Sequence, residues 1–381
     1  MNPDNKKNSF PKKKNSDFVE ACQKMQQLLK KYMENTPCKS FSKNKIAASD
    51  IRVGHVDGKA VKRLVIHLRS NGCGWKKSGG CTMCGFWSET SQLKEKIHTK
   101  HFINQFKDVL KKFDIAQFPI LSIYNAGSIL NEDEVPFFAL EKIFNLVTQI
   151  PTIKQVVLES RIEYIDFEKV RCLKSILKEK ELVIASGLES SNDTIRELCI
   201  HKGLPKKHFE RYIEQTHSFG VKTSIYLLIK PPFLTEYEAI EDAVTSAKYL
   251  YDLNVRDIHF ETMTIEEYTL VHTLYDKGYY KVPWLWSIIE IIKRLSPSIK
   301  PFISPFRYIA NSKEVPNNNH LCTETVTKAI LNDYCSDFNI SHLVNLDCTC
   351  KRQWLEAIEE TDIQPIEKRA LHYLAILSSQ S

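Results

Sequence analysis

The sequence predicts an α/β fold in which parallel strands form an open, partial barrel. Two observations lead to this expectation. Apolar runs with the length of buried strands alternate along the chain with stretches of helical periodicity. These runs are apolar on both faces, as a parallel sheet covered by helices requires. Six such units are too few for a closed eight-stranded barrel, so a partial barrel of the (β/α)6 type is expected.

Each predicted strand but the last is followed by a predicted helix, which in turn leads to the next strand. The strands are expected at residues 61–68, 119–127, 155–160, 181–190, 222–229 and 257–263. The helical stretches between them are 100–114, 132–149, 165–179, 191–218 and 235–253. Because β–α–β connections within one sheet are right-handed, this order predicts a parallel sheet with right-handed crossovers.

We divide the chain into three parts. Residues 1–49 form a lysine-rich leader and a helix, since apolar residues recur at helical spacing over 17–34. Residues 50–281 form the α/β core. Residues 282–381 form a small C-terminal accessory region, in which the strand–helix alternation gives way to an amphipathic helix and four cysteines.

Composition and charge are those of an ordinary cytoplasmic enzyme. The 381 residues are 43% hydrophobic and 26% charged. No apolar run approaches the roughly 20 residues that span a bilayer, and the N-terminus lacks the apolar stretch of a secretory signal. Residues 1–45 carry eleven lysines and four acidic residues, which account for the whole net charge of +7. This leader is either a solvated segment or a contact for a phosphate backbone, and the remainder is close to neutral.

Three cysteines in a glycine-rich loop give the strongest chemical signal. Cys73, Cys81 and Cys84 have C-x7-C-x2-C spacing and directly follow the first predicted strand, at the end of the sheet where α/β active sites lie. Thiolates are the usual ligands of iron–sulfur clusters. A four-iron cube with three cysteine ligands leaves one iron open to a substrate or cofactor. The eleven cysteines of this long chain therefore fit reduced thiols and metal ligands better than a disulfide framework.

A zinc site is the alternative interpretation of the same cysteines. Cys81 and Cys84 are followed by His98 and His101, which resembles a zinc finger and would suit a non-catalytic interaction module. The histidine spacing is shorter than usual, however, and this arrangement leaves Cys73 unused. Three unligated core cysteines fit less well, because the loop is polar and rich in glycine.

A second group of cysteines lies near the C-terminus. These residues are candidate ligands of a structural zinc, with Cys348 and Cys350 as one half-site and Cys322 and His320 as further ligands. Cys335 lies between the two pairs. Two tryptophans upstream, Trp284 and Trp286, are expected in the core rather than stacked on a nucleic-acid base.

The cysteine loop and the motifs after it resemble radical S-adenosylmethionine enzymes. Within that class they are similar to the branch that contains the radical subunit of archaeosine synthase, itself similar to the elongator catalytic subunit. The resemblance covers roughly residues 50–355. It is carried by GCGWKKSGGCTMCGF (72–86), NAGSILNEDEVP (125–136), LESRIEYI (158–165), GLESSNDTIRELCIHKG (187–203), LLIKPPFLTEYEAIEDA (227–243) and TLVHTLYDKGYYKVPWLW (269–286).

The resemblance implies a cofactor set and a reaction. Cys73, Cys81 and Cys84 would hold a [4Fe–4S] cluster whose open iron binds S-adenosylmethionine, and reduction by an external electron donor would yield a 5′-deoxyadenosyl radical. In the archaeosine branch the substrate is a lysine adduct of 7-cyano-7-deazaguanine in tRNA. It is made by a separate transferase subunit and loses its lysine carbon chain by radical C–N cleavage. A radical enzyme with the same core acting on a small metabolite or peptide is the alternative.

The resemblance also implies cofactor contacts after the second strand. Radical S-adenosylmethionine enzymes commonly carry a GGE-like turn there, whose backbone receives the methionyl amino group. This chain has Asn125, Ala126, Gly127 and Ser128 at that place. Asn125, Gly127 and Ser128 are therefore expected to bind the cofactor. Because the turn departs from GGE, the side-chain contact there would come from Asn125 or from one of the acids Glu132 and Glu134.

Charged residues at the ends of the later strands complete the predicted site. Glu159 and Arg161 follow the third strand and Glu189 ends the fourth, where they suit the carboxylate or ribose of the cofactor, or the substrate. A salt bridge at the mouth of the barrel is the alternative for each. Lys230 after the fifth strand and Glu261 on the sixth join Glu189 as candidate catalytic groups: a cation for a carboxylate and a polar substrate contact, respectively.

Overall fold

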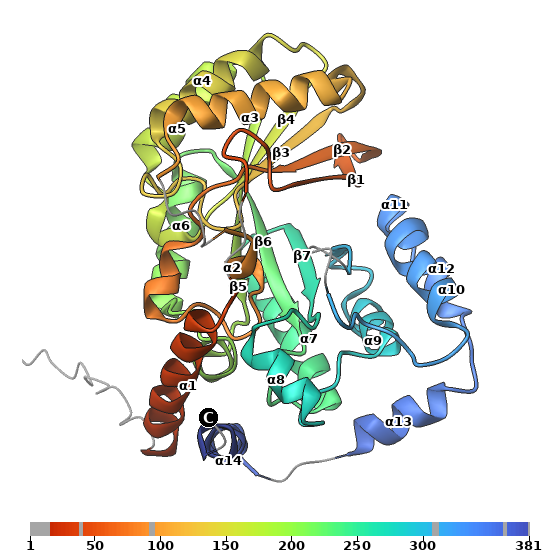
Figure 1. Cartoon of the computed structure of the whole chain (residues 1–381). Helices are drawn as coiled ribbons and strands as arrows, with labels where there is room; N and C mark the ends of the chain where they lie inside the picture. Colours follow the sequence, from red (N-terminus) through yellow and green to blue (C-terminus); the bar gives the residue numbers. More distant parts are fainter. Residues whose placement is uncertain (1–15, 38–40, 91–95, 307–311, 361–363, 380–381) are drawn as a thin grey trace, which may run out of the picture.

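The computed structural model describes residues 16–37, 41–90, 96–306, 312–360 and 364–379, so the lysine leader at 1–15 lies outside the described residues. At its centre is one curved sheet of eight strands in the order β1-β2-β3-β4-β5-β6-β7-β8 (Figure 1). The strands are β1 (Ala48–Val56), β2 (Lys59–His67), β3 (Ile120–Tyr124), β4 (Gln155–Glu159), β5 (Glu181–Glu189), β6 (Lys222–Ile229), β7 (Asp257–Thr262) and β8 (Phe302–Ile303).

The six predicted strands are confirmed as β2 to β7, and each pairs in parallel with its neighbour in the chain. Two strands were not predicted. The first, β1, pairs antiparallel with β2 and is mostly exposed or half-buried, so it lacks the apolar run that marks the others. The second, β8, has only two residues and extends the parallel order beyond β7. The predicted partial α/β barrel is therefore confirmed, with one strand added at each edge.

The helices between strands lie outside the sheet, as expected. They are α3 (Thr99–Lys112), α4 (Phe137–Thr148), α5 (Phe167–Leu177), α6 (Lys206–Ser218) and α7 (Glu236–Asp252). The predicted helix over 191–218 is interrupted: a short π-helical turn, η4 (Ile195–Cys199), is followed by an extended segment before α6. Gly203, with φ of +63°, and Pro205 lie in this gap, and both are poor helix residues.

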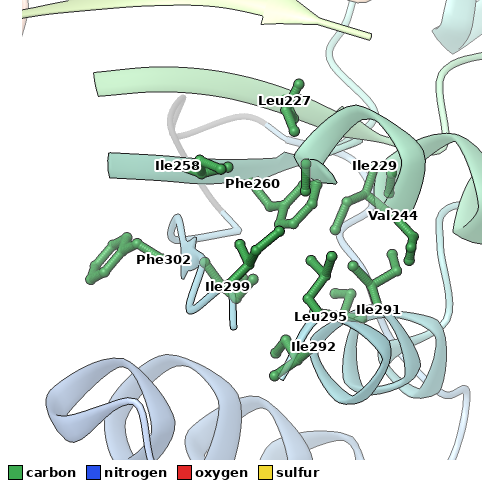
Figure 2. Packing of buried hydrophobic residues seen from close by; sticks show 14 of the residues in the cluster. Leu227, Ile229, Val244, Ile258, Phe260, Ile291, Ile292, Leu295, Ile299 and Phe302 are labelled. Carbon is green, nitrogen blue, oxygen red and sulfur yellow. The ribbon is translucent and has the colours of Figure 1, made fainter. Parts of the chain in front are cut away.

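A hydrophobic core between sheet and helices fixes the second half of the barrel. In Figure 2, Phe260 of β7 and Ile229 of β6 point toward Val244 of α7 and Ile291 of α9 (Leu285–Leu295). The same core continues into the C-terminal region, where Tyr334 and the residues around it are buried. Residues 282–381 are thus packed against the barrel. They include α10 (Thr323–Lys328), η5 (Ala329–Tyr334), α11 (Cys335–Asp337), α12 (Ser341–Val344) and α13 (Lys351–Glu359).

The two terminal helices pack against each other. The predicted N-terminal helix is confirmed as α1 (Ser16–Glu34), and Figure 1 shows it beside α14 (Ile366–Ser379). Buried residues of both helices, such as Met25 and Leu374, share a core with η4 and with α8 (Leu270–Asp276). Among the described residues, no helix has the length and apolar character needed to cross a membrane.

Candidate functional site

The three cysteines of the loop after β2 line one cavity. The loop runs through a 3-10 turn, η1 (Gly74–Ser78), to a short helix, α2 (Phe86–Thr90). Cys73, Cys81 and Cys84 all face a cavity of about 70 Å³. Ala126, from the turn after β3, faces it too. The spacing that predicted a shared metal centre therefore brings the three thiols together.

A buried carboxylate fixes one side of the cysteine loop. Glu134, in the segment after β3, accepts four hydrogen bonds from N–H groups. Oε1 accepts from the backbone of Gly74 (2.8 Å) and the amide of Asn131 (3.0 Å), and Oε2 from the backbone of Ser128 (2.7 Å) and the amide of Asn125 (2.9 Å). This single side chain thus connects the residue after Cys73 to the turn after β3.

Gly127 allows these two segments to approach. A Cβ atom at this position would lie 2.1 Å from Oε2 of Glu134 and 3.0 Å from the Cα of Cys73. The first distance is shorter than real Cβ contacts, and the second, to the backbone, is tighter than most of them. Glycine at 127 is therefore needed for the packing of the turn against the cysteine loop, a structural reason for a residue predicted to bind the cofactor.

The segment between η4 and α6 holds the other side of the loop. The backbone N–H of Thr82 donates to the carbonyl of Ile200 (3.0 Å), and its hydroxyl donates to the carbonyl of Cys199 (2.7 Å). The indole of Trp75 donates to the carbonyl of His201 (2.8 Å). A Cβ at Gly203 would collide with the Trp75 ring, so this glycine also permits a close approach. The loop is therefore anchored at both ends before any metal binds.

Burial keeps the three cysteines protonated in the absence of a metal. It raises the pKa of Cys73 to about 11, with a further contribution from Glu134, and it also raises the pKa values of Cys81 and Cys84. A thiolate that is removed from water is stable only when a positive charge lies beside it. Iron ions would supply that charge, since metal binding displaces the thiol proton. The donor set and its enclosure thus fit an iron–sulfur cluster.

A larger cavity inside the barrel adjoins the cysteines. It has a volume of about 200 Å³ and shares Cys84, Phe86 and Ala126 with the cysteine cavity. Carboxylates at the ends of three parallel strands face it, namely Glu159 of β4, Glu189 of β5 and Glu261 of β7. Its polar wall also includes Arg52, His67, Tyr226 and Glu266. The two cavities therefore adjoin, and Cys84, Phe86 and Ala126 lie in the wall of both.

The three carboxylates have different environments. Burial raises the pKa of Glu159 to about 7, and the neighbouring charge of Glu261 adds to the shift. Glu189, at φ of +68°, pairs with the ammonium of Lys202 at 2.7 Å. Glu261 accepts a hydrogen bond from Ser304 at 2.6 Å. Near neutral pH the cavity can thus offer one carboxyl that gains or loses a proton beside two carboxyls with fixed partners.

Comparison with known proteins identifies the family. Archaeosine synthase subunit beta of Methanosarcina acetivorans is 34% identical over 328 residues, which cover 84% of this chain and 91% of that protein. Archaeosine synthase subunit beta of Thermococcus kodakarensis is 30% identical over 80% of this chain and 94% of its own length. The chain belongs to the archaeosine synthase subunit beta family. The predicted resemblance to this family is confirmed.

Two further comparisons complete this result. No family model matches the chain. Among solved structures, methylornithine synthase superposes with a TM-score of 0.49 at 11% identity, over 94% of this chain and 88% of that one. The family assignment therefore rests on the sequence relatives.

In this subunit beta homologue, several predicted site residues are engaged in holding the loops. Asn125 and Ser128 donate to Glu134, and the Ser128 hydroxyl accepts from the backbone N–H of Arg161 at 3.2 Å. The guanidinium of Arg161 donates to Glu163 and to the carbonyl of Lys202. It also lies over the ring of Trp75. The contacts of Arg161 are therefore those of a salt bridge at the mouth of the barrel, which was the alternative interpretation of this residue.

Lys230 is placed apart from the other predicted residues. Its ammonium pairs with the buried carboxylate of Glu236 at 2.5 Å. Both residues line a different cavity, between α7 and the segment that follows α8. The structure therefore brings Glu189 and Glu261 together but not Lys230.

Three residues of the site were missed or undervalued in the sequence. Arg52 lies on β1, a strand without an apolar signature, so its approach to the barrel cavity was not visible. Lys202 lies inside the motif 187–203, and its position next to Gly203 was the one feature of the sequence that could have marked it as part of the site. Glu134 is in the motif 125–136, but a fourfold buried acceptor cannot be told from an exposed glutamate by sequence alone.

The zinc-finger alternative is not supported by the placement of its histidines. His98 and His101 begin α3, where the backbone N–H of His98 donates to the ring of His101 at 3.0 Å. Within the described ranges, the side chains close enough together to hold one ion do not include these histidines. Cys81 and Cys84 instead share their cavity with Cys73.

Proposed function

We propose that this chain is the radical subunit of an archaeosine-forming system. It holds a [4Fe–4S] cluster on Cys73, Cys81 and Cys84, binds S-adenosylmethionine and cleaves a C–N bond in a lysine-modified 7-deazaguanine of tRNA. The observation that supports the proposal is that the cysteine cavity and the barrel cavity adjoin at Cys84, Phe86 and Ala126. A cofactor held beside the thiols would therefore lie next to the cavity that the strand-end carboxylates line.

The side chains around the cavity have tasks that suit this reaction. When bound, the cluster and S-adenosylmethionine would supply the radical that abstracts a substrate hydrogen. Glu159, Glu189 and Glu261 can accept hydrogen bonds from ribose hydroxyls or bind the ammonium group of a lysine-derived chain. Arg52 can pair with a carboxylate of the cofactor or substrate.

The partners follow from the same proposal. The relatives are named as a subunit beta, so we infer a second subunit, the transferase that attaches lysine. An external electron donor reduces the cluster. Transfer RNA contacts the rim of the barrel, the lysine leader or the partner subunit. The protein works in the cytoplasm, where such thiols stay reduced.

Anaerobic reconstitution tests the proposal. The full chain is loaded with iron and sulfide, reduced with dithionite and given S-adenosylmethionine, and 5′-deoxyadenosine is measured. We expect about four irons per chain, and product formation that is lost in Cys73→Ala, Cys81→Ala and Cys84→Ala. Cys172→Ala, a change on α5 outside both cavities, is the matched control and should retain the iron and the formation of 5′-deoxyadenosine. Product formation that survives the three loop variants would refute the proposal.

A second stage tests the substrate. Transfer RNA that carries the lysine adduct should raise the rate of 5′-deoxyadenosine formation and should itself be converted to the formamidino base. Unmodified tRNA is the control. Conversion of a free small molecule or a peptide, with none of tRNA, would replace the archaeosine assignment by the alternative class of substrate.

A further inference from the structure

We propose that His320, Cys322, Cys348 and Cys350 bind one structural zinc ion in the C-terminal region. One ligand atom from each of these residues lies within 4.8 Å of all the others. The sulfurs of Cys322 and Cys350 are 3.5 Å apart, and the sulfur of Cys348 is 3.1 Å from Nδ1 of His320. Ligands of a tetrahedral zinc, with Zn–S of about 2.3 Å and Zn–N of about 2.0 Å, are separated by roughly 3.5–3.8 Å. The two close pairs therefore need to move by a few tenths of an ångström, and the widest pair by about 1 Å at most.

Two N–H groups already point at the sulfurs. The indole of Trp286, on α9, donates to Cys350 at 3.2 Å. The amide of buried Asn318 donates to Cys322 at 3.4 Å, and its orientation is fixed because its oxygen accepts from the backbone N–H of Leu285. Donors of this kind stabilise thiolates bound to a metal and orient them. The site thus has an outer layer of contacts as well as a ligand set.

The chemistry of the four residues favours zinc. Three sulfurs and one imidazole in a tetrahedral arrangement match a Cys3His structural site. With all positions filled by protein atoms, no place remains for a substrate, so the ion would be structural rather than catalytic. A four-iron cube needs ligands on separate irons, and ligand atoms that all lie within 4.8 Å of one another fit a single ion better. Cys335 is not part of the group, since its thiol is buried and donates to the carbonyl of Ile303.

The ion would join segments that are distant in sequence. His320 and Cys322 immediately precede α10, and Cys348 and Cys350 immediately precede α13. Trp286 connects the same point to the core beside β6 and β7. One ion would therefore tie both loops of the accessory region to the barrel. This role does not depend on the proposed radical reaction.

Metal analysis of the cluster-loaded full chain tests the site, because iron then occupies the loop cysteines. We expect about one zinc per chain, and its loss in Cys348→Ser and Cys322→Ser. Cys335→Ala, a buried cysteine of the same region, is the matched control and should keep the zinc. Cobalt substitution should give the visible absorption of a tetrahedral thiolate site in the wild type and in Cys335→Ala, but not in the other two variants.

The results that would overturn the proposal are distinct from those that test the radical reaction. Zinc that is absent from the wild type, or that persists in both serine variants, would exclude this site. A disulfide between Cys322 and Cys350, detected by mass spectrometry after thiol blocking without reduction, would also exclude the site, because disulfide-bonded sulfurs cannot act as thiolate ligands. None of these outcomes changes the iron content or the formation of 5′-deoxyadenosine on which the proposed function depends.

Discussion

The buried carboxylate of Glu134 offers a direct test of how the cysteine loop is held. Its two oxygens accept four N–H bonds, two each. In Glu134→Gln one oxygen becomes an amide nitrogen, which cannot accept. With the amide nitrogen in the place of Oε1, the backbone N–H of Gly74 loses its acceptor; in the place of Oε2, the backbone N–H of Ser128 loses it. An asparagine can instead turn its own amide and accept, as Asn125 can with its oxygen. The change keeps the size of the side chain, so its effect reports on hydrogen bonding rather than packing.

The expected loss of stability is large for a single conservative substitution. A buried donor without an acceptor costs about 1–3 kcal/mol, and at least one backbone N–H is left in this state. Part of this is offset, because burial raises the pKa of Glu134 and the variant no longer buries a charge. We therefore expect the free energy of unfolding to fall by about 1–3 kcal/mol.

Urea unfolding of the metal-free protein, followed by circular dichroism under reducing conditions, measures this loss. Glu132→Gln is the matched control: this carboxylate is two residues away, exposed, and paired with Lys169 at 2.6 Å. Its loss should cost less than about 1 kcal/mol. Glu134→Gln should also release iron faster after reconstitution, because Gly74 next to Cys73 loses its anchor. If the two variants unfolded within about 0.5 kcal/mol of each other, the bridging role of Glu134 would be refuted.

Two further predictions concern the barrel cavity and the terminal helices. Because the pKa of Glu159 is raised to about 7, the folded state holds its proton more tightly than the unfolded chain, and stability is lost as pH rises from about 4.5 through 7. A shift of this size changes the free energy of unfolding by at most about 3 kcal/mol, and solvent reduces the effect because the side chain is only half-buried. In urea unfolding, the free energy of unfolding of Glu159→Gln minus that of wild type should therefore rise by about 1–2 kcal/mol from pH 5 to pH 8. A constant difference between the two proteins would contradict this environment. Leu374→Ala empties a fully buried position on α14 and should lower the free energy of unfolding by about 2–4 kcal/mol, whereas exposed Leu355→Ala on α13 should change it by less than about 0.5 kcal/mol, and equal effects would contradict the packing.

The central strands could be predicted because of their position in the sheet. Strands β2 to β7 each bury a central run of residues, and most of these residues are apolar. The edge strands carry no such signal, since β1 is mostly half-buried or exposed and β8 is too short. The cysteine site was predictable because three thiols in one glycine-rich loop need little tertiary information to be brought together.

The rest of the site depends on backbone turns that the sequence does not reveal. Ala126, Glu189 and Lys230 have φ values of +55°, +68° and +60°, although none is a glycine. All three lie at the ends of parallel strands, and this conformation changes the direction in which the side chain leaves the strand. Glu189 faces the barrel cavity, whereas Lys230 pairs with Glu236 in another cavity. The presence of a charged residue at a strand end was therefore not enough to predict which cavity its side chain faces.

The terminal helices contribute to the wall of the cysteine cavity, α1 directly and α14 by packing against α1. From α1, the side chains of Leu29, Tyr32 and Met33 line the cavity that contains the three cysteines. The carbonyl of Met33 also accepts a hydrogen bond from the indole of Trp87 in α2. Because α14 packs along α1, a change such as Leu374→Ala acts on a wall of this cavity although it lies outside it. An iron–sulfur cluster there would depend on that wall to exclude oxygen and water, so the substitution should shorten the lifetime of the cluster in air beyond what the loss of stability alone explains.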